Sequence, residues 1–473
     1  MPLPTIPSGN VFSSLPTGYD VDNSCRFNSG DSAYLSRTME AATNRKKCTI
    51  SVWLKKCSLS GNQVFFGGGD GDAANGFIDF NSSNDFFMQA STNTVDMQFV
   101  SDAKYRDTAS WYHVLVAIDT TQATDTNRVK IYINGTQVTS FSTATYPDQD
   151  YDLQWAVTGD TMLVGKYPYT SSYWDGYMAE FHYVDGTAYS PSDFGEFDED
   201  SPTIWKPIEV SGLTYGNQGF YLDFADSGDL GDDESGNTND FTENNLAATD
   251  QSTDTPTNSF CTMNPLDNYH AGSTLSEGNL KVVGASGGWN GTNTATMGVS
   301  AGKWYWELFA DTDANVEVYG IKSGVSHTDS NYVTETTATG ELGYAYVTTS
   351  GNMGYPSGNS ESYGSAIDAD DVIMFALDMD NLKFYIGING TWQNSGDPAG
   401  NSNGYSITAP PSGFYFPAVS FYVVETIYLN FGSPPTGFTI SSGNADGDGY
   451  GNFEYSVPSG FYSLCTKNLA EYG

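Results

Sequence analysis

The chain is poor in basic residues, and this shortage limits the partners that it can have. Its 473 residues include 18 Lys and Arg against 57 Asp and Glu, which gives a formal net charge of −39. Nucleic-acid binding needs a basic footprint that this composition does not supply. An acidic chain also has no electrostatic attraction to an anionic membrane. We therefore expect no nucleic-acid partner and no membrane insertion, and we interpret the charge as a source of solubility in a salt-screened medium.

Cysteines and long apolar runs are also scarce. The five cysteines are an odd number with no CxxC pair, so neither a disulfide framework nor a zinc site is predicted, and most are expected to be reduced and buried. No stretch of about 18 apolar residues is present, which excludes a membrane-spanning helix. The opening MPLPTIPSGNVFSSLPTGY lacks the basic start and apolar run of a signal peptide, so we expect synthesis in a cytoplasm.

The chain is rich in the residues that build β-structure. It contains 51 Gly, 32 Tyr and 27 Phe. Aromatic residues favour strands, whereas Gly, Asn and Asp favour tight turns. Runs such as CTISVWLKK alternate along the chain, with Ile50, Val52 and Leu54 on one face, and helical periodicity is limited to a hint near the C-terminal end. The length and the turn spacing predict two or three all-β domains, built as sandwiches or barrels.

One hairpin sequence occurs twice in the chain. KIYINGTQV runs from Lys130 to Val138, and KFYIGINGTW runs from Lys383 to Trp392. An Asn-Gly pair between β runs is a strong hairpin signal, because both residues tolerate positive φ. We therefore interpret the NGT triplets at Asn134, Asn290 and Asn389 as turns rather than glycosylation sites. The repetition predicts two copies of one architecture.

Each half of the chain resembles a known module. The segments CTISVWLKK, WYHVLVAID, KIYING and VGKYPYTSSYWDGYMAEFHYVDGTAYSPSDFGEFD resemble a LamG-type, concanavalin A-like jelly roll. The segments GKWYWELFAD, VYGIKSG, LGYAYVTTSGNMGY, DDVIMFALDMDNLKFYIGINGTW and FYFPAVSFY resemble a SPRY domain, which is itself a concanavalin-like double sheet. These resemblances imply an all-β chain of two concanavalin A-like antiparallel β-sandwich (jelly-roll) domains.

The expected domain boundaries follow from these matches and from an acidic segment between them. Residues 207–280 contain no Lys or Arg, and SGDLGDDESGNTNDFTENN is dense in carboxylates. Such a charge run predicts a solvated linker. The predicted parts are an N-terminal arm for attachment at 1–25, a LamG/concanavalin A-like sandwich at 26–206, an acidic linker with short ordered pieces at 207–279, a SPRY-like sandwich at 280–440 and a C-terminal extension at 441–473.

The chain as a whole is similar to virion proteins of bacteriophages, especially marine ones. The phrases LPTIPSGNV, SCRFNSGDSAYLSR, DESGNTNDFTENNLAATDQSTDTPTNSFCTMNPL and GFYSLCTKNL carry this resemblance. It implies a tail fibre or another external appendage of the virion. The expected partners are other virion proteins, a host cell-surface glycan or receptor, and further copies of the chain, with a trimer favoured.

Catalytic motifs are few. No nucleophile elbow, P-loop or HExxH motif occurs. The four histidines are His113, His182, His270 and His327. His113 and His182 lie within apolar strand runs, where a lone His is more often packed than catalytic.

One acidic run suggests an enzyme. GEFDED places Glu196, Asp198 and Asp200 at alternate positions, and some concanavalin-like glycoside hydrolases carry a Glu-x-Asp-x-Glu strand. Retaining hydrolysis needs two carboxylates about 5 Å apart. Here the third acid is Asp, and the run falls just before Pro202. We therefore expect no enzymatic activity, and we keep a glycoside hydrolase as the second alternative.

No cofactor is required by the sequence, although a structural calcium ion is left open. Calcium binds closely spaced Asp, Asn and carbonyl oxygens. Two loops qualify by composition, and the second matches the first half of an EF-hand loop without its bidentate Glu. The candidate ligands are Asp70 and Asp72 in GGGDGD, and Asn444, Asp446 and Asp448 in NADGDGYG. Plain turns are the alternative explanation.

Aromatic loops are the candidate binding surface. Sandwiches bind ligands at their end loops, and sugar faces stack on aromatic rings. In the first module the candidates are Tyr167, Tyr169, Tyr173 and Trp174 of KYPYTSSYWDG. In the second they are Tyr355, Tyr363, Trp392 and Asp397. Any of these rings could instead cap the core or face a neighbouring subunit.

Together these observations predict a phage virion protein without catalysis, most simply a tail fibre or appendage component that binds a host-surface glycan or protein through its end loops. The first alternative is a capsid-decorating or head-fibre protein that binds no ligand.

Overall fold

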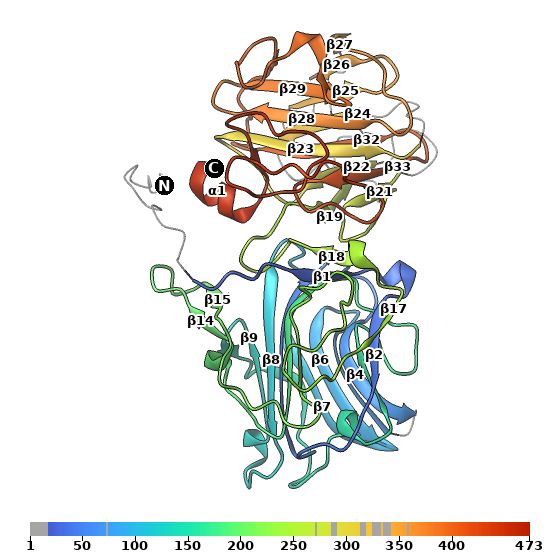
Figure 1. Ribbon diagram of the computed structural model, residues 1–473, viewed down its shortest axis with the longest axis vertical. Coiled ribbons are helices and arrows are strands. Elements are labelled where there is room, and N and C mark those ends of the chain that lie inside the picture. Colours follow the sequence, from blue (N-terminus) through green and yellow to red (C-terminus); the bar gives the residue numbers. More distant parts are fainter. Residues whose placement is uncertain are drawn as a thin grey trace.

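The computed structural model describes residues 18–71, 74–269, 272–284, 291–312, 318–323, 333, 342–356 and 359–473. Within these residues the chain is all-β, as the sequence predicts. Two β-sandwiches lie end to end along the long axis of the molecule (Figure 1). The first is built mainly from the N-terminal half of the chain and the second from the C-terminal half.

The first sandwich has two antiparallel sheets, each with eight strands among the described residues. One sheet has the order β10 (Thr136–Gln137), β9 (Val129–Ile133), β8 (Trp111–Asp119), β3 (Lys47–Lys56), β13 (Gly176–Asp185), β1 (Ser24–Phe27) and β18 (Gln251–Ser252), with β16 (Phe220–Leu222) also on β13. The other has the order β11 (Phe141–Thr145), β7 (Thr94–Lys104), β6 (Asp85–Thr92), β5 (Ala74–Phe80), β4 (Gln63–Gly71), β12 (Thr161–Val164), β2 (Tyr34–Thr38) and β17 (Thr242–Asn244). A separate hairpin joins β14 (Gly195–Phe197) to β15 (Trp205–Pro207).

The second sandwich has sheets of seven and nine strands among the described residues. The seven-stranded order is β19 (Met263–Tyr269), β22 (Gly291–Ala295), β32 (Tyr415–Phe421), β24 (Val318–Ser323), β25 (Gly343–Val347), β26 (Asn352–Tyr355) and β27 (Asn359–Ser362). The nine-stranded sheet has the order β20 (Thr274–Ser276), β21 (Lys281–Val283), β33 (Thr426–Asn430), β23 (Lys303–Ala310), β28 (Val372–Asp378), β29 (Lys383–Ile388) and β30 (Thr391–Trp392), with β31 (Tyr405–Ser406) on β29 and β34 (Tyr462–Ser463) on β23.

Strand alternation sets which side chains enter each core, since successive side chains point to opposite faces. On β3, Ile50, Val52 and Leu54 are fully buried in the first core. On β23, Trp304 and Trp306 lie in the second core in the same way. The periodicity therefore predicts the core-facing side of β3 correctly, and β23 alternates in the same way.

The two Asn-Gly hairpins form in both sandwiches. Asn134 and Gly135 have φ of 48° and 72° between β9 and β10. Asn389 and Gly390 have φ of 45° and 79° between β29 and β30. Both Asn side chains also accept a hydrogen bond from the strand before the hairpin, with Asn134 Oδ1 2.7 Å from the His113 amide nitrogen on β8 and Asn389 Oδ1 2.9 Å from that of Val372 on β28. The turn prediction is confirmed at these two sites, whereas Asn290 lies outside the described residues.

The segment 207–279 differs from the predicted linker, because it is built into both sandwiches. β16 pairs with β13, β17 with β2 and β18 with β1 in the first sandwich. β19 pairs with β22 in the second. Its apolar side chains are sparse, but five of them are buried in the first core, namely Phe220, Leu222, Phe224, Leu230 and Phe241.

Several carboxylates of this segment cap turns, although Asp226, Asp229, Glu234 and Asp240 are also exposed, as a solvated run predicts. Asp233 Oδ1 accepts hydrogen bonds from the amides of Tyr221 and Ser235, and Oδ2 accepts one from the amide of Asn239. Asp226 Oδ1 accepts one from the Gly228 amide. An Asx side chain that bonds the backbone a few residues on stabilises a turn without any apolar contact. The acidic run therefore encodes turns.

The C-terminal residues wrap across the outer face of β23. Glu307 is fully buried there, and it accepts hydrogen bonds from the amides of Glu454 and Tyr455 and from the Tyr305 hydroxyl. Burial raises the pKa of Glu307 to about 7. The chain then ends in α1 (Thr466–Tyr472), where the sequence predicts a helical turn.

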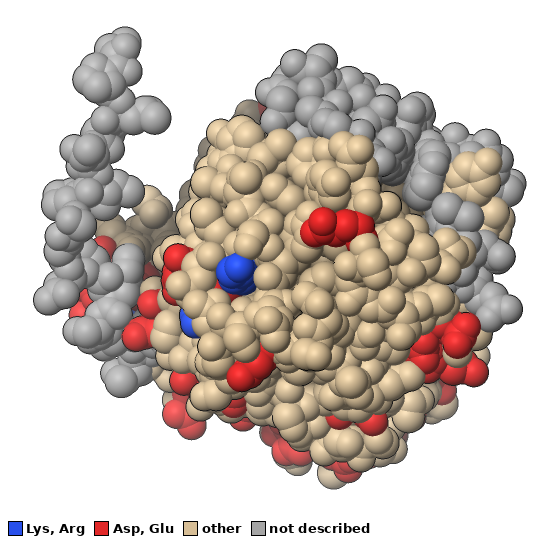
Figure 2. Space-filling model, turned by 90° about the horizontal axis from the view of Figure 1, so that it is seen from above, with Lys and Arg blue, Asp and Glu red and all other residues tan. Residues whose placement is uncertain are grey.

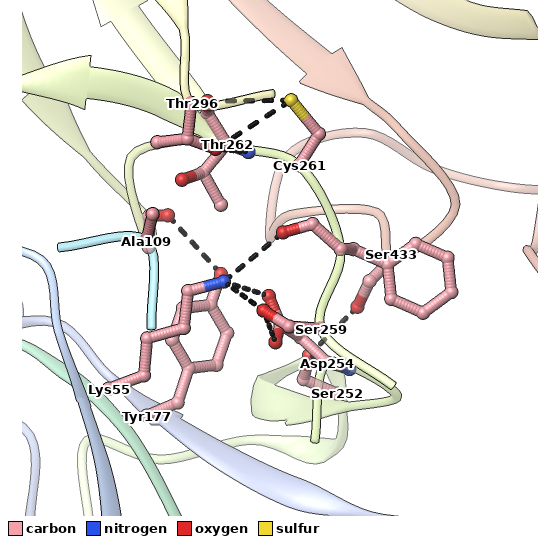
Figure 3. A network of polar contacts seen from close by, with 12 residues as sticks. Lys55, Ala109, Tyr177, Ser252, Asp254, Ser259, Cys261, Thr262, Thr296 and Ser433 are labelled. Carbon is pink, nitrogen blue, oxygen red and sulfur yellow. Dashed lines mark hydrogen bonds and ion pairs between the residues drawn. The ribbon is translucent and has the colours of Figure 1, made fainter. Parts of the chain in front are cut away.

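The two sandwiches meet through buried polar groups. Lys55 Nζ lies 2.7 Å from Asp254 Oδ2, and both side chains are at most 1% exposed (Figure 3). Lys55 also donates to the carbonyl of Phe260 and to Ser259 Oγ. Asp254 Oδ1 accepts a hydrogen bond from the Trp111 indole. The strand β3 of the first sandwich is thereby tied to the segment that enters the second.

A second buried cation extends this junction. The Arg26 side chain, on β1, is completely buried and lies 3.6 Å from Glu277 and 3.8 Å from Asp250. Its guanidinium donates to the Thr249 carbonyl and to Thr436 Oγ1. Because Thr436 belongs to the second sandwich, the ion-pair network spans the junction.

All five cysteines are buried and free, as predicted.

Candidate functional site

The loop after β12 places the predicted aromatic side chains in different environments. Lys166 and Tyr173 form an antiparallel bridge across it. Trp174 points into the core, where it is fully buried against Phe65. Tyr167 packs edge-on against Phe77 at 4.5 Å between ring centroids. Of the four candidates in this loop, Trp174 is therefore a core residue, and Tyr173 and Tyr169 remain next to open surface.

A groove of about 470 Å³ lies beside this loop, on the outer face of the sheet that contains β2, β4 and β12. Alternation on β2 directs Leu35 into the core and Tyr34 and Ser36 outward. The side chains that line the groove are mostly polar or aromatic, and they include Tyr34, Ser36, Asp160, Thr161, Lys166 and Tyr169. A polar groove with hydrogen-bond donors, a carboxylate acceptor and aromatic walls suits a hydroxylated ligand.

Lys166 is the cation of this groove. Its Nζ lies 4.2 Å from the ring centroid of Tyr34 and 5.7 Å from that of Tyr173. The two rings are 6.2 Å apart. Ammonium groups within about 6 Å of an aromatic face are attracted by the ring quadrupole. The lysine is thus held at the groove by two rings, and it makes no ion pair with a carboxylate of the described residues.

A bare backbone forms one wall of the groove. Gly69 has φ of +142°, and a Cβ there would lie 2.3 Å from the Ala74 carbonyl oxygen and 2.9 Å from the Tyr169 hydroxyl. Only glycine lets the Tyr169 ring approach β4 this closely. The sequence draws attention to GGGDGD for its acids, whereas the structure assigns Gly69 a steric role.

The candidates of the second sandwich are also divided. Tyr363 is 6% exposed and Trp392 packs against Tyr305 and Tyr385. Asp397 Oδ1 accepts a hydrogen bond from the Gly400 amide and so caps its own turn. Tyr355 stays half-buried beside Tyr405, a residue that the sequence reading does not select.

The candidate calcium ligands are occupied by protein donors where they are described. Asp446 accepts five hydrogen bonds, from the amides of Asp448, Tyr450 and Ser463, from Ser463 Oγ and from Asn468 Nδ2. Asn444 donates to two carbonyls. Among the residues that the structure describes, no group of three or more His, Cys, Asp and Glu is placed to hold a metal ion. The described geometry of this loop fits a capped turn.

The other candidate loop is described only in part. Asp72 and the side chain of Asp70 lie outside the described residues. A calcium site there stays a prediction.

The acidic run of the glycosidase alternative lies on the β14–β15 hairpin. Lys206 Nζ is 3.4 Å from Glu196 and 3.3 Å from Asp198. Hydrogen bonds from the Ser201 amide, and then from the other donors around it, lower the pKa of the half-buried Asp198. A glycosidase acid needs a raised pKa. Asp200 donates its amide to Asp198 and is exposed. The hairpin thus resembles a solvated ion-pair cluster.

The described histidines are packed in the first sandwich. His113 Nε2 lies 2.8 Å from Ser51 Oγ, which superficially resembles a nucleophile and its base. However, the Trp205 indole donates to His113 Nδ1 at 3.0 Å. Nδ1 is therefore an acceptor, so the neutral ring carries its proton on Nε2 and donates to Ser51. Burial lowers the pKa of His113 to about 3. His270 and His327 lie outside the described residues.

A cluster around His182 is not visible in the sequence. Glu180 sits at a β-bulge in β13 with φ of 48° and is 5% exposed. It accepts hydrogen bonds from the hydroxyls of Tyr221 and Tyr19. His182 stacks on Tyr221 at 4.1 Å and hydrogen-bonds Tyr215. The cluster holds the start of the described chain on the sheet, and only the bulge, which no sequence pattern marks, brings Glu180 to it.

Comparison with known proteins relates the first sandwich to a lectin superfamily. Residues 28–193 match the family model for the concanavalin A-like lectin/glucanases superfamily. No curated protein matches the chain. This match agrees with the LamG-like resemblance of the first half and covers the groove beside Lys166. No helix among the described residues is both long and apolar enough to cross a membrane.

Solved structures match parts of the chain at low identity. The SPRY domain of human HERC1 is 19% identical, with a TM-score of 0.28, covering 37% of this chain and 99% of that domain. A heptameric SAP-like pentraxin from Limulus polyphemus is 12% identical, with a TM-score of 0.27, covering 36% of this chain and 80% of the pentraxin. At these TM-scores the likenesses carry no argument about function.

Proposed function

We propose that this chain is a non-catalytic binding protein that takes a glycan in the groove beside Lys166. The observation that carries the proposal is the Lys166 ammonium, held between the rings of Tyr34 and Tyr173 at the edge of a polar hollow of about 470 Å³. Ring faces stack on sugar C–H surfaces, while ammonium and hydroxyl groups bind sugar oxygens. The concanavalin A-like fold of residues 28–193 supports carbohydrate or protein binding.

We further propose that the protein works on a phage virion as part of a tail fibre or similar appendage. Support comes from the four sequence phrases that resemble marine phage virion proteins. The strongly acidic surface favours a displayed protein that stays soluble at high local concentration. Other virion proteins, further copies of the chain in a trimer, and a host-surface glycan or receptor are the partners of this proposal.

A glycan array tests the binding site. Wild-type protein should bind a defined subset of saccharides, and Tyr34→Ala and Lys166→Ala should each weaken that binding about tenfold or more, since a lost aromatic or charged contact costs about 1.4 kcal/mol or more. Tyr132→Ala, a half-buried tyrosine on β9, is the matched control. If both groove variants bind like the wild type, the groove is not the site.

Immunogold electron microscopy tests the location. An antibody against residues 372–430, applied to intact phage particles that carry this chain, should label tails or fibres. Label over the head would favour the capsid-decorating alternative, and the absence of label on every particle would overturn the virion assignment.

A further inference from the structure

Among the described residues, the second sandwich presents an end with few charged side chains. Between Lys383 and Glu425 the only charged residue is Asp397, in a chain with a net charge of −39. Figure 2 looks onto this end of the molecule, where most described atoms are uncharged and Asp and Glu stand in small separate groups. Composition alone would distribute acids over this surface, so their shortage here sets the end apart.

The loop between β30 and β31 is held in one conformation. Four non-glycine residues of the loop 393–404 have left-handed backbone conformations, with φ of 54° at Asn394, 53° at Ser395, 50° at Asn401 and 57° at Asn403. Side chains hold the loop in place, because Asn394 Nδ2 donates to the Asn403 carbonyl and Asn403 Nδ2 donates to the Ser395 carbonyl. All four residues are exposed. Backbone strain that the surroundings enforce is typical of ligand clamps.

The base of the loop is fixed as well. Backbone hydrogen bonds join Asp397 and Ser402 in both directions, at 2.9 and 3.0 Å. The Tyr385 hydroxyl donates to Asn401 Oδ1 from the strand β29 below. A loop fixed before binding loses little conformational entropy when a ligand arrives. Its exposed amides and hydroxyls are therefore pre-organised.

An aromatic cluster stands directly after this loop. Tyr405 is half-buried and lies 6.4 Å from Tyr355, with the two ring planes within 24° of parallel. Tyr363 and Tyr344 support it at 6.2 and 6.0 Å. The carboxylate of Glu361 lies close to Tyr405, and burial together with this carboxylate raises the pKa of the tyrosine to about 12.

We propose that Tyr405, Tyr355, Glu361 and the loop 393–404 form a second saccharide site, which takes uncharged sugars. The rings offer a surface for sugar C–H faces, and the Asn amides and the Glu361 carboxylate match sugar hydroxyls. A carboxylate at the site and the acidic chain around it repel sugars that carry carboxylate or sulfate groups. This inference rests on the proposed glycan-binding function but uses residues of the other sandwich.

Affinity electrophoresis of the full chain tests the site. Native gels contain dextran, mannan or a soluble β-glucan as uncharged probes, and alginate or heparin as anionic ones. Wild-type protein should be retarded by at least one uncharged probe. Tyr405→Ala should raise the dissociation constant for that probe at least tenfold, while Tyr405→Phe, which keeps the ring, should stay within about threefold of the wild type. Asn403→Ala, which frees the loop, is the second variant, and Tyr132→Ala is the control.

The outcomes separate this inference from the proposed function. Retardation that Tyr405→Ala and Asn403→Ala both leave unchanged overturns the second site, and so does retardation by the anionic probes alone or by none of the probes. Retardation that Tyr34→Ala removes while Tyr405→Ala leaves it unchanged upholds the groove and overturns the second site. The reverse result upholds the second site and overturns the groove. Mobility in probe-free gels and near-ultraviolet circular dichroism show whether each variant is folded.

Discussion

At the scale of single residues, Asp79 is a buried acid without an adequate partner. It lies on the outer side of β5, opposite Val64 and Phe87 on the neighbouring strands, and is 1% exposed. Its Oδ1 has no hydrogen-bond partner among the described residues. Burial raises the pKa of Asp79 to about 8, and Lys56 opposes this only in part. A carboxyl group in such surroundings is held neutral.

The substitution Asp79→Asn should stabilise the protein above neutral pH. A folded-state pKa raised from 3.8 to about 8 leaves stability intact below pH ~4 and removes it as the pH rises toward 8. Asn cannot ionise, so we expect a gain of about 2 kcal/mol at pH 8 and little change at pH 4. Thermal unfolding across this range measures it, with the exposed Asp148→Asn as control. Equal stability of Asp79→Asn and wild type at pH 8 would contradict the buried-acid account.

His113 gives a pH dependence of the opposite sign. Its folded-state pKa is lowered from 6.5 to about 3, so its contribution to stability is complete above pH ~6.5 and is lost as the pH falls toward 3. His113→Gln should remove part of the acid-induced fall in melting temperature between pH 6 and 4. It should also lower stability at pH 7, because it disturbs the hydrogen bonds to Ser51 and Trp205. If the melting temperature of His113→Gln falls between pH 6 and 4 as much as that of the wild type, His113 does not titrate on unfolding.

At the scale of elements, the sequence predicts long strands well and capped turns poorly. The alternation on β3 and β23 and the two Asn-Gly hairpins fix both architectures, because period and turn chemistry are local signals. The strands β16, β17 and β18 have three residues or fewer, which is too short for a period to show. The position of these strands in the fold is set by apolar side chains that enter the core, such as Phe220, and by Asx caps, such as Asp233.

The candidate sites show the same difference between local signals, which the sequence carries, and contacts between distant residues, which it does not. Composition locates the aromatic loop that bounds the groove, but it cannot show that Trp174 turns into the core. It also misses Tyr34, because a tyrosine at the start of an ordinary strand carries no signal until Lys166 is placed across its ring. Tyr405 is hidden for the same reason, since its partners come from β26 and β27.

The capped turn at Asp446 yields a prediction for the C-terminal wrap. Asp446→Ala should lower the free energy of unfolding by about 2–4 kcal/mol, because several buried donors lose their acceptor. Asp448→Ala, which removes the acceptor of one exposed hydrogen bond from the Tyr472 hydroxyl, should cost less than about 1 kcal/mol. Thermal unfolding in EDTA and in millimolar calcium should rank the stabilities of the wild type and the two variants in the same order. A rise in the wild-type melting temperature with calcium that Asp446→Ala abolishes would instead make this loop a metal site.

At the scale of the whole molecule, buried ion pairs couple the two sandwiches. Lys55→Met leaves Asp254 charged and buried without its partner, which costs about 3–5 kcal/mol. We expect wild-type protein to unfold in one calorimetric transition and the variant to unfold in two. The exposed pair of Lys46 with Asp150 supplies the control, since Lys46→Met should cost about 1 kcal/mol or less. Two transitions already present in the wild type would mean that the junction does not couple the sandwiches.

Binding of a glycan in the groove of the first sandwich is tested most directly by a crystal structure with ligand. Crystals are soaked with the saccharide that the wild-type protein binds best on the glycan array. We expect a sugar ring stacked on Tyr34 or Tyr173, with one of its oxygens within hydrogen-bonding distance of Lys166 Nζ. Sugar density elsewhere on the molecule, with the groove beside Lys166 empty, would contradict it.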